Sequence, residues 1–157
     1  MKLMIRQRVF SWSDTYDIYD ETGEARYFVQ TGLFRLGHQI HVYDKRSGEE
    51  VGSVHQRLLT FLPAFEVVLD GRTVGTVQKE LSFFLPRYHV DYRGWSVQGD
   101  MLSWSYQVLD RGSCVMSIDK RPFSWGDTYV LDYDSPADEL PGLLLVLAID
   151  AANCDRD

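Results

Sequence analysis

The chain has 157 residues, 45% of them hydrophobic and 25% charged, which is typical of one soluble domain with a substantial core and argues against disorder. Its net charge of −7 argues against a mainly electrostatic nucleic-acid binder, whose footprint would be basic, and against adhesion to anionic membranes through overall charge. The aromatic content of 13% favours strands whose large side chains face a core.

The first predicted element is a hairpin around "FSWSDTY" (residues 10–16), a phrase that returns as "FSWGDTY" (residues 123–129). Residues 51–71 also align without a gap on residues 74–94, which gives four related segments. Each segment has a β-branched residue, a long polar residue, an aromatic residue, a turn residue, an aromatic residue and an aliphatic residue. These are Ile5, Gln7, Trp12, Asp14, Tyr16 and Ile18; Val54, Gln56, Phe61, Pro63, Phe65 and Val67; Val77, Lys79, Phe84, Pro86, Tyr88 and Val90; and Ile118, Lys120, Trp125, Asp127, Tyr129 and Leu131. Because Pro and Asp start turns between alternating segments, we interpret each copy as two strands and a turn.

The connecting segments are similar as well. Residues 29–54 and 97–118 both run through Val-Gln, a glycine-containing corner, an alternating strand and a glycine-containing turn. The chain therefore divides into two related halves, about 1–71 and 72–135, with about six strands in each. Twelve short strands separated by turn signals predict a barrel or a sandwich.

The last predicted element is a helix within residues 136–154. Ser135 is a candidate N-cap before Pro136, although the continuous helix could instead begin near Pro141. From Leu143 to Ala152 nearly every residue is apolar, so the helix is buried on all sides. A twelve-stranded barrel needs material in its lumen. We therefore predict one domain, residues 1–157, in which a barrel (about 1–135) surrounds this helix.

Several motifs resemble one known family. They are the opening Q-R-x-F-S-W-x-D-x-Y-x-I-Y-D, the repeated V-G-x-V-x-[QK]-x-L and the terminal L-x-V-L-A-I-D-A. Together they resemble the LURP-one-related family of the tubby C-terminal-like superfamily, with phospholipid scramblases as more distant relatives. The resemblance covers essentially the whole chain. It implies a mainly β fold, a closed twelve-stranded antiparallel barrel around a hydrophobic C-terminal α-helix.

The same resemblance implies less about activity. Tubby domains bind phosphoinositide head groups through clustered basic residues, and scramblases have a longer apolar C-terminal segment, acylated cysteines and an acidic calcium-binding stretch. This chain is acidic, has no cysteine-rich run and has a short helix. The resemblance therefore assigns no catalytic residue here.

The signals for cellular location are consistent with one another. The start "MKLMIRQRVF" has no signal-peptide h-region, and the apolar run Leu143–Ile149 is far below the ~20 residues of a membrane span. Cys114 and Cys154 form no C-x-x-C motif, which is typical of free thiols in a reducing compartment. We predict a cytoplasmic protein without a transmembrane segment.

Candidate reactive groups have simpler structural interpretations. Asp14 and Asp127 form a carboxylate pair only if their hairpins meet, and Asp also caps turns. His38 and His41 lie three residues apart, hence on opposite faces of a strand, and His55 and His89 lie in other hairpins. The two cysteines lack an activating neighbour. The acidic run that could hold calcium, Asp132, Asp134, Asp138 and Glu139, also suits a strand end and a helix first turn. We predict no catalytic residue, metal site or cofactor.

Basic side chains provide the remaining candidate site. Lys79, Arg87 and Arg93 lie in one predicted hairpin, with Arg57 and Arg72 in neighbouring segments. Arg57, Lys79, Arg87 and Arg93 could bind an anionic head group, although such residues also keep sheet edges soluble. The expected function is a non-enzymatic binding or scaffold module for an unidentified protein or lipid. The alternatives are a peripheral phospholipid or phosphoinositide binder, a scramblase-like membrane-associated protein, and an enzyme with an unrecognised site.

Overall fold

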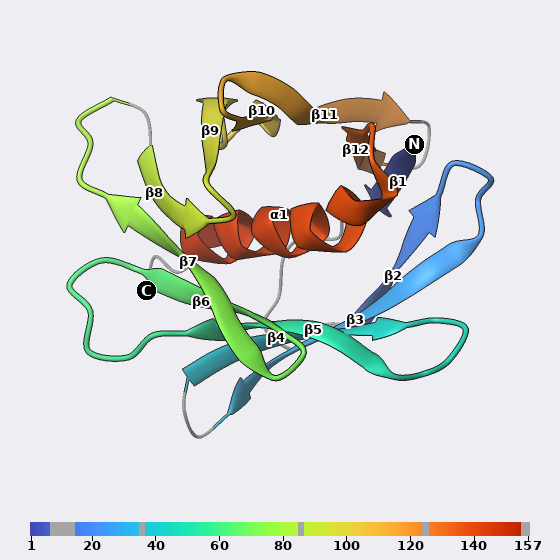
Figure 1. Cartoon of the computed structure of the whole chain (residues 1–157), viewed down its shortest axis with the longest axis horizontal. Coiled ribbons are helices and arrows are strands. Elements are labelled where there is room, and N and C mark those ends of the chain that lie inside the picture. The colour runs from blue at the N-terminus through green and yellow to red at the C-terminus, as the bar shows by residue number, and fades with distance from the viewer. Residues whose placement is uncertain (7–14, 35–36, 85–86, 124–125, 155–157) are drawn as a thin grey trace.

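Strands account for most of the chain. The computed structural model describes residues 1–6, 15–34, 37–84, 87–123 and 126–154 (Figure 1). The strands are β1 (Lys2–Arg6), β2 (Thr15–Asp20), β3 (Ala25–Phe34), β4 (Gly37–Asp44), β5 (Glu50–Gln56), β6 (Ala64–Leu69), β7 (Arg72–Glu80), β8 (Arg87–Tyr92), β9 (Trp95–Asp100), β10 (Ser105–Asp110), β11 (Ser113–Phe123) and β12 (Gly126–Tyr133). A 3₁₀ turn (Pro136–Asp138) and helix α1 (Glu139–Cys154) follow.

The twelve strands form one antiparallel sheet that curls into a nearly closed barrel. Its order is β8-β7-β6-β5-β4-β3-β2-β1-β12-β11-β10-β9. The first and last strands pair with each other, with Ile5 opposite Tyr129. The two ends of the order are β8 and β9, which follow one another in the chain. The mainly β fold predicted from the sequence, with twelve antiparallel strands around a C-terminal helix, is confirmed.

Two-residue turns join three pairs of consecutive strands at one end of the barrel. Their central residues, Asp70-Gly71, Arg93-Gly94 and Arg111-Gly112, all have positive φ, the geometry that suits tight antiparallel hairpins. The turns at 70–71 and 111–112 join fully paired strands, β6–β7 and β10–β11. After the turn at 93–94, β8 and β9 form no ladder over the described residues. We call this break the β8–β9 seam.

Each of the four related segments spans two adjacent strands. Residues 5–18 include parts of β1 and β2, residues 54–67 of β5 and β6, residues 77–90 of β7 and β8, and residues 118–131 of β11 and β12. The halves expected from the sequence correspond to β1–β6 and β7–β12. In each pair the first strand ends, and the second begins, at the end of the barrel opposite the two-residue turns, because successive strands alternate in direction.

Helix α1 forms the centre of the core. It passes between β3–β7 and β9–β12 (Figure 1). Its central residues are at most 1% exposed, and they are Leu143, Leu144, Leu145, Val146, Leu147, Ala148, Ile149, Ala151 and Ala152. The wall closes tightly on it, since a Cβ at Gly52 would lie 2.7 Å from Leu144 Cδ1. Within the described residues, no helix is both long enough and apolar enough to cross a membrane.

The helix start differs from both positions considered in the sequence. The 3₁₀ turn begins at Pro136, and α1 begins at Glu139. Pro141 lies in the first helical turn, where its missing N–H is not needed. Ser135 occupies the N-cap position of the 3₁₀ turn, with extended backbone and Pro136 directly after it, as expected, but its side chain makes no capping hydrogen bond.

A buried carboxylate fixes the N-terminal end of α1 to the wall. Glu139 is 5% exposed and accepts hydrogen bonds from Arg26 Nε at 2.6 Å and from the Tyr27 hydroxyl at 2.6 Å. The Tyr133 hydroxyl donates to its second oxygen. The Tyr92 hydroxyl donates to the carbonyl of Pro141 at 3.2 Å. Strands β3, β8 and β12 thus hold one end of the helix, and its other end points toward the long connections.

Candidate functional site

Large apolar side chains project from two neighbouring connections. They are Leu58, Leu59 and Phe61 between β5 and β6, and Leu81, Phe83 and Phe84 between β7 and β8. We call these six residues the apolar tip. Leu59, Phe61, Phe83 and Phe84 are each at least 92% exposed, so their side chains pack against almost nothing in the protein. Soluble proteins rarely leave several such side chains together without a function.

The two connections lie side by side. The amide of Lys79, at the end of β7, donates to the carbonyl of Pro63 in the first connection at 2.9 Å. Both loops extend to the left in Figure 1, the side toward which the C-terminal end of α1 also points. The β3–β4 hairpin adjoins them, because a Cβ at Gly37 would lie 2.9 Å from Leu58 Cδ2. Leu33 in that hairpin is also 72% exposed.

Three of the four predicted basic residues lie at the base of the apolar tip. Arg57 directly follows β5, Lys79 is near the end of β7, and Arg87 begins β8. Arg57 and Arg87 are exposed. Lys79 is half-buried and lies opposite Tyr88, on the same face of β7 as the buried Val77. The structure therefore brings these three residues to one end of the barrel.

Arg93 lies elsewhere. It is the first residue of the β8–β9 turn, at the opposite end of β8 from Arg87. Its guanidinium lies 4.8 Å from the ring centre of Trp95 and donates a hydrogen bond to Asp138 at 3.3 Å. These contacts hold the turn against the start of the helix segment. Arg72 begins β7, also at the end away from the apolar tip.

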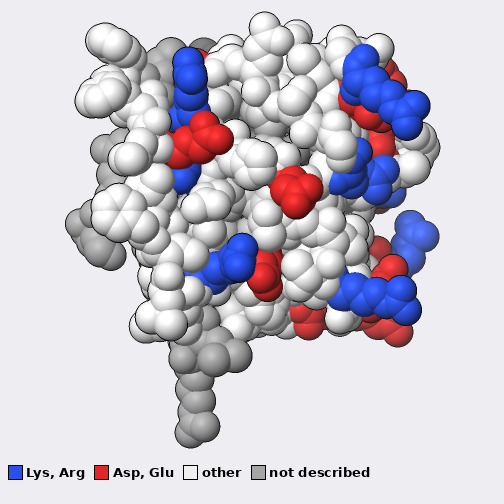
Figure 2. All heavy atoms as spheres, turned by 60° about the vertical axis from the view of Figure 1, so that its left-hand side comes forward, with Lys and Arg blue, Asp and Glu red and all other residues white. Residues whose placement is uncertain are grey.

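Carboxylates offset much of the positive charge near the apolar tip. Glu66 Oε1 lies 3.6 Å from Arg57 Nε, and Glu80 lies opposite Arg87 across β7 and β8. Figure 2 brings this side of the molecule forward and shows basic and acidic side chains interspersed among uncharged ones. The local charge is thus close to balanced, and the exposed apolar side chains are the dominant feature of this end.

The other candidate groups have structural partners or remain undescribed. Asp14 lies outside the described residues. The backbone of Asp127 lies opposite Pro122 in the β11–β12 ladder. Cys114 is exposed, its thiol 3.5 Å from the carbonyl of Met116, and Cys154 is the last residue of α1. Among the described residues, no group of three or more His, Cys, Asp or Glu is arranged to hold a metal ion.

The acidic run is divided among separate contacts. Asp132 Oδ1 lies 3.8 Å from the amino group of Met1, Asp138 pairs with Arg93, and Glu139 accepts hydrogen bonds from Arg26, Tyr27 and Tyr133. These carboxylates serve the strand end and the helix first turn, the structural interpretation weighed from the sequence.

Two histidines that are distant in the sequence meet on the outer face of β4 and β5. The rings of His41 and His55 lie 5.7 Å apart. His41 also contacts Glu50, with Nδ1 2.5 Å from Oε1, and His55 Nε2 lies 2.8 Å from Ser53 Oγ. Burial, with a further contribution from His41, lowers the pKa of His55. The sequence assigned these histidines to different hairpins and did not indicate this contact, which depends on the register of β4 and β5.

The structure also shows a half-buried carboxyl group in the barrel that the sequence did not single out. Asp150 lies on α1, and burial raises its pKa to about 7. Tyr106 is 4% exposed, and burial, together with the Asp150 charge, raises its hydroxyl pKa well above the usual value. The only signal in the sequence was one carboxylate within an otherwise apolar helix.

Comparison with known proteins gives consistent results. A family model described as LURP-one-related matches residues 1–150. YxjI of Bacillus subtilis (strain 168), an uncharacterised protein, is 30% identical over 150 residues, which cover 96% of this chain and 92% of YxjI. The X-ray structure of a protein from Arabidopsis thaliana is similar over 97% of this chain and 90% of its own, with a TM-score of 0.62 and 18% identity. That structural similarity supports the fold.

Proposed function

The chain belongs to the LURP-one-related family, and from its structure we propose that it is a non-enzymatic protein that binds membrane surfaces by inserting the apolar tip. We treat residues 1–157 as one domain that acts in the cytoplasm. The observation that carries the proposal is the near-complete exposure of Leu59, Phe61, Phe83 and Phe84 on two adjacent loops. This develops one alternative drawn from the sequence, a peripheral lipid binder, and replaces a basic patch with apolar insertion as its main contact.

A bilayer suits these loops better than a protein groove does. Leu59 and Phe83 are fully exposed, so they project from the surface instead of forming a flat, packed patch. Projecting Phe and Leu side chains can enter the boundary between head groups and acyl chains, as the apolar faces of interfacial helices do. Full burial of one such side chain is worth about 1.5–3 kcal/mol, so four of them can offset a substantial cost of association.

The basic residues have a secondary role in this proposal. Arg57 and Arg87 stand at the base of the loops, at the level of the head groups if the loops insert. A basic residue near an anionic surface contributes about 1 kcal/mol, but Glu66 and Glu80 oppose this contribution. We therefore expect binding to depend strongly on the apolar side chains and only weakly on salt, whereas binding through charge alone would weaken steeply as salt rises.

Co-sedimentation with vesicles tests the proposal. The native chain should bind vesicles of phosphatidylcholine, and bind somewhat more tightly when phosphatidylglycerol is included. The double change Phe83→Ser and Phe84→Ser should weaken binding on the order of tenfold or more, because two large apolar groups no longer enter the bilayer. Arg57→Gln should weaken it only about two- to threefold, and only at low salt.

A matched control removes an exposed apolar side chain elsewhere. Val74 is 42% exposed and lies near the start of β7, away from the apolar tip. Val74→Ser should leave vesicle binding unchanged. If the native chain binds neither type of vesicle, or if Val74→Ser weakens binding as much as the Phe83/Phe84 change, the proposal is wrong and a protein partner becomes the better explanation of the apolar tip.

A further inference from the structure

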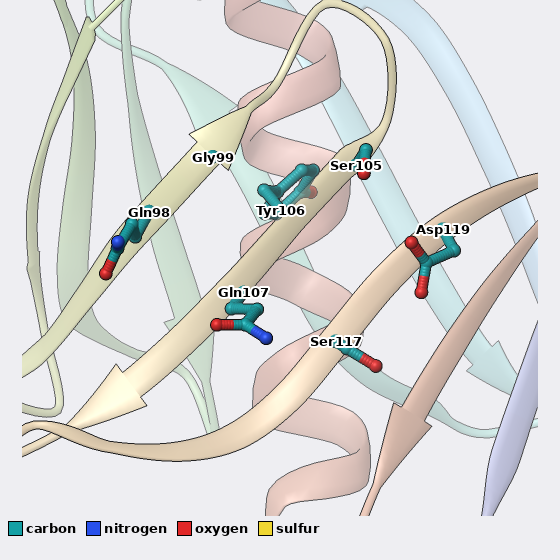
Figure 3. A pocket seen from close by; sticks show the side chains of 7 residues that line it. All are labelled: Gln98, Gly99, Ser105, Tyr106, Gln107, Ser117 and Asp119. Carbon is teal, nitrogen blue, oxygen red and sulfur yellow. The ribbon is translucent and has the colours of Figure 1, made fainter.

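A second surface feature lies on the outer wall of β9, β10 and β11. It is a hollow of about 260 Å³ lined by Gln98, Gly99, Ser105, Tyr106, Gln107, Ser117 and Asp119 (Figure 3). The side chains come from three neighbouring strands in two cross-strand rows. Gln107 lies opposite both Gln98 and Ser117, and Ser105 lies opposite Asp119. The wall thus sets five polar side chains around one depression.

The hollow exists because its floor lacks side chains. Tyr106 points inward toward α1 and is 4% exposed. Gly99, which faces it across the ladder, has a φ of +127°, and a Cβ there would lie 2.7 Å from Tyr106 Cα. Only glycine fits at this position. The short side chains of Ser105 and Ser117 keep the space open beside the longer glutamines.

The polar groups of the hollow are available to a ligand. Within the described part of the chain, the side chains of Gln98, Ser105, Gln107, Ser117 and Asp119 form no hydrogen bond or ion pair with another residue. Two carboxamides and two hydroxyls both donate and accept, and the Asp119 carboxylate accepts. This set differs from the polar residues of the neighbouring β9–β10 connection, where Asp100 is bonded to Leu102 and Ser103.

The chemistry of the lining selects one class of ligand. No cationic side chain lines the hollow and Asp119 is acidic, so phosphate and other anions are disfavoured. There is little apolar wall to hold a hydrocarbon. A ring with several hydroxyl groups matches alternating donors and acceptors, and the hollow holds roughly eight waters, about the size of one sugar ring. We propose that this hollow binds an uncharged polyhydroxylated ring, presented as the head group of a glycolipid.

Two properties of the hollow favour a sugar ring presented by a membrane over a free sugar. They are the low affinity of an open polar site and the position of the hollow in the barrel. A hydrogen bond between protein and sugar replaces hydrogen bonds that both groups made with water, so each one changes the affinity by only about two- to tenfold. An open polar hollow therefore binds a free sugar weakly. Because the strands alternate in direction, the β9–β10 connection lies at the same end of the barrel as the apolar tip. A bilayer that holds the apolar tip would supply head groups to this wall at high effective concentration. This step rests on the proposed membrane function.

Vesicles with and without a sugar head group provide the test. Phosphatidylcholine vesicles containing glucosyl diacylglycerol should bind the native chain about tenfold more tightly than vesicles containing plain diacylglycerol. Gln107→Leu, which keeps the side-chain size but removes its hydrogen bonds, should abolish this increment and leave the remaining binding unchanged. The control Gln30→Leu, on the outer face of β3, should retain the full increment.

A second experiment distinguishes a glycolipid from a free sugar as the ligand, and it separates failure of the sugar site from failure of membrane binding. Methyl glucoside added without vesicles should shift the NMR signals of the Gln98 and Gln107 side-chain amides at millimolar concentration. A response to methyl glucoside without any vesicle increment would reject the glycolipid source and assign the site to a free sugar. The Phe83/Phe84 change should weaken vesicle binding on the order of tenfold or more, as above, but should leave the methyl glucoside response unchanged. If neither probe responds, or if Gln107→Leu responds like the native chain, the polyol site is wrong, whether or not the apolar tip binds membranes.

Discussion

At the scale of single residues, Asp150 shows how the barrel interior alters ordinary chemistry. The residue lies on α1 near Tyr106, whose hydroxyl pKa rises partly because of the Asp150 charge. Burial is the cause of the raised Asp150 pKa, about 7, against an ordinary value of 3.8. A carboxyl group in this position is largely protonated below neutral pH, where it fits the apolar surroundings, and above neutral pH it becomes a charge in a half-buried position.

The expected result is a stability that falls as pH rises. Between pH 3.8 and about 7 the unfolded chain has lost this proton while the folded chain retains it, so each increase in pH favours unfolding until the folded group also titrates. Asp150→Asn should therefore be more stable than the native chain at pH 8, by up to about 4 kcal/mol, and nearly equal to it at low pH. Thermal unfolding at acidic and alkaline pH measures the difference. An equal effect of the substitution at both pH values would show that burial does not control this group.

At the scale of elements, α1 fills the part of the barrel interior that the side chains of the strands cannot fill. A sheet of twelve strands encloses a lumen too wide for its own side chains to fill. The helix fills it with nine residues that are at most 1% exposed. Glu139 and Pro141 fix its first turn to β3, β8 and β12 through hydrogen bonds. The helix is thus held laterally by packing and at one end by polar contacts.

A charged side chain placed on the buried helix should strongly destabilise the folded state. Leu145→Lys puts an ammonium group where Leu145 is 0% exposed, which should cost about 3–5 kcal/mol or more. Leu145→Met, which nearly preserves the volume, should cost less than about 1.5 kcal/mol. Urea unfolding of both variants gives the comparison. A midpoint for Leu145→Lys equal to that of Leu145→Met would contradict the buried position of α1.

The sequence predicted the strands and the helix better than it predicted which apolar side chains are exposed to solvent. Alternation and turn residues located the paired strands, and the uniform apolar character of residues 143–152 located the core helix. The repeat pattern aligned Phe61 and Phe84 with Trp12 and Trp125, just before the predicted turn residue, but it did not indicate that both phenylalanines lie on exposed connections. The run of apolar residues just before Pro63 and Pro86 was the available signal, because proline has no N–H to donate to a strand ladder and so marks a break in strand pairing. Contacts such as His41 with His55 depend on strand register, which periodicity alone does not define.

At the scale of the whole molecule, the β8–β9 seam is the feature that the pattern of hairpins did not predict. The turn at Arg93-Gly94 has positive φ values similar to those of two turns that join paired strands. A hairpin register from this turn would place Arg87 opposite Asp100, a favourable pair. The described structure nevertheless leaves the facing edges of β8 and β9 without a ladder. The wall is therefore held by pairing everywhere except at this seam.

Hydrogen exchange should detect the seam. Amides in β8 and β9 should exchange faster than those in β3 and β4, because strands with one unpaired edge open with less free energy than strands paired on both sides. The matched comparison is the β10–β11 hairpin, which has the same kind of turn and a complete ladder. Equal protection of β8–β9 and β10–β11 would mean that the seam is closed in solution.

The pairing of β1 with β12 has a consequence for how the protein reaches this state in the cell. Within this domain, β1 is synthesised well before its partner β12, and the apolar helix α1 is synthesised after both. Before α1 packs against them, the apolar inner faces of the strands remain exposed and can bind chaperones or other chains. The barrel cannot be completed before α1 has been synthesised, and we expect the yield in the cell to depend on the interval between synthesis of β12 and docking of α1.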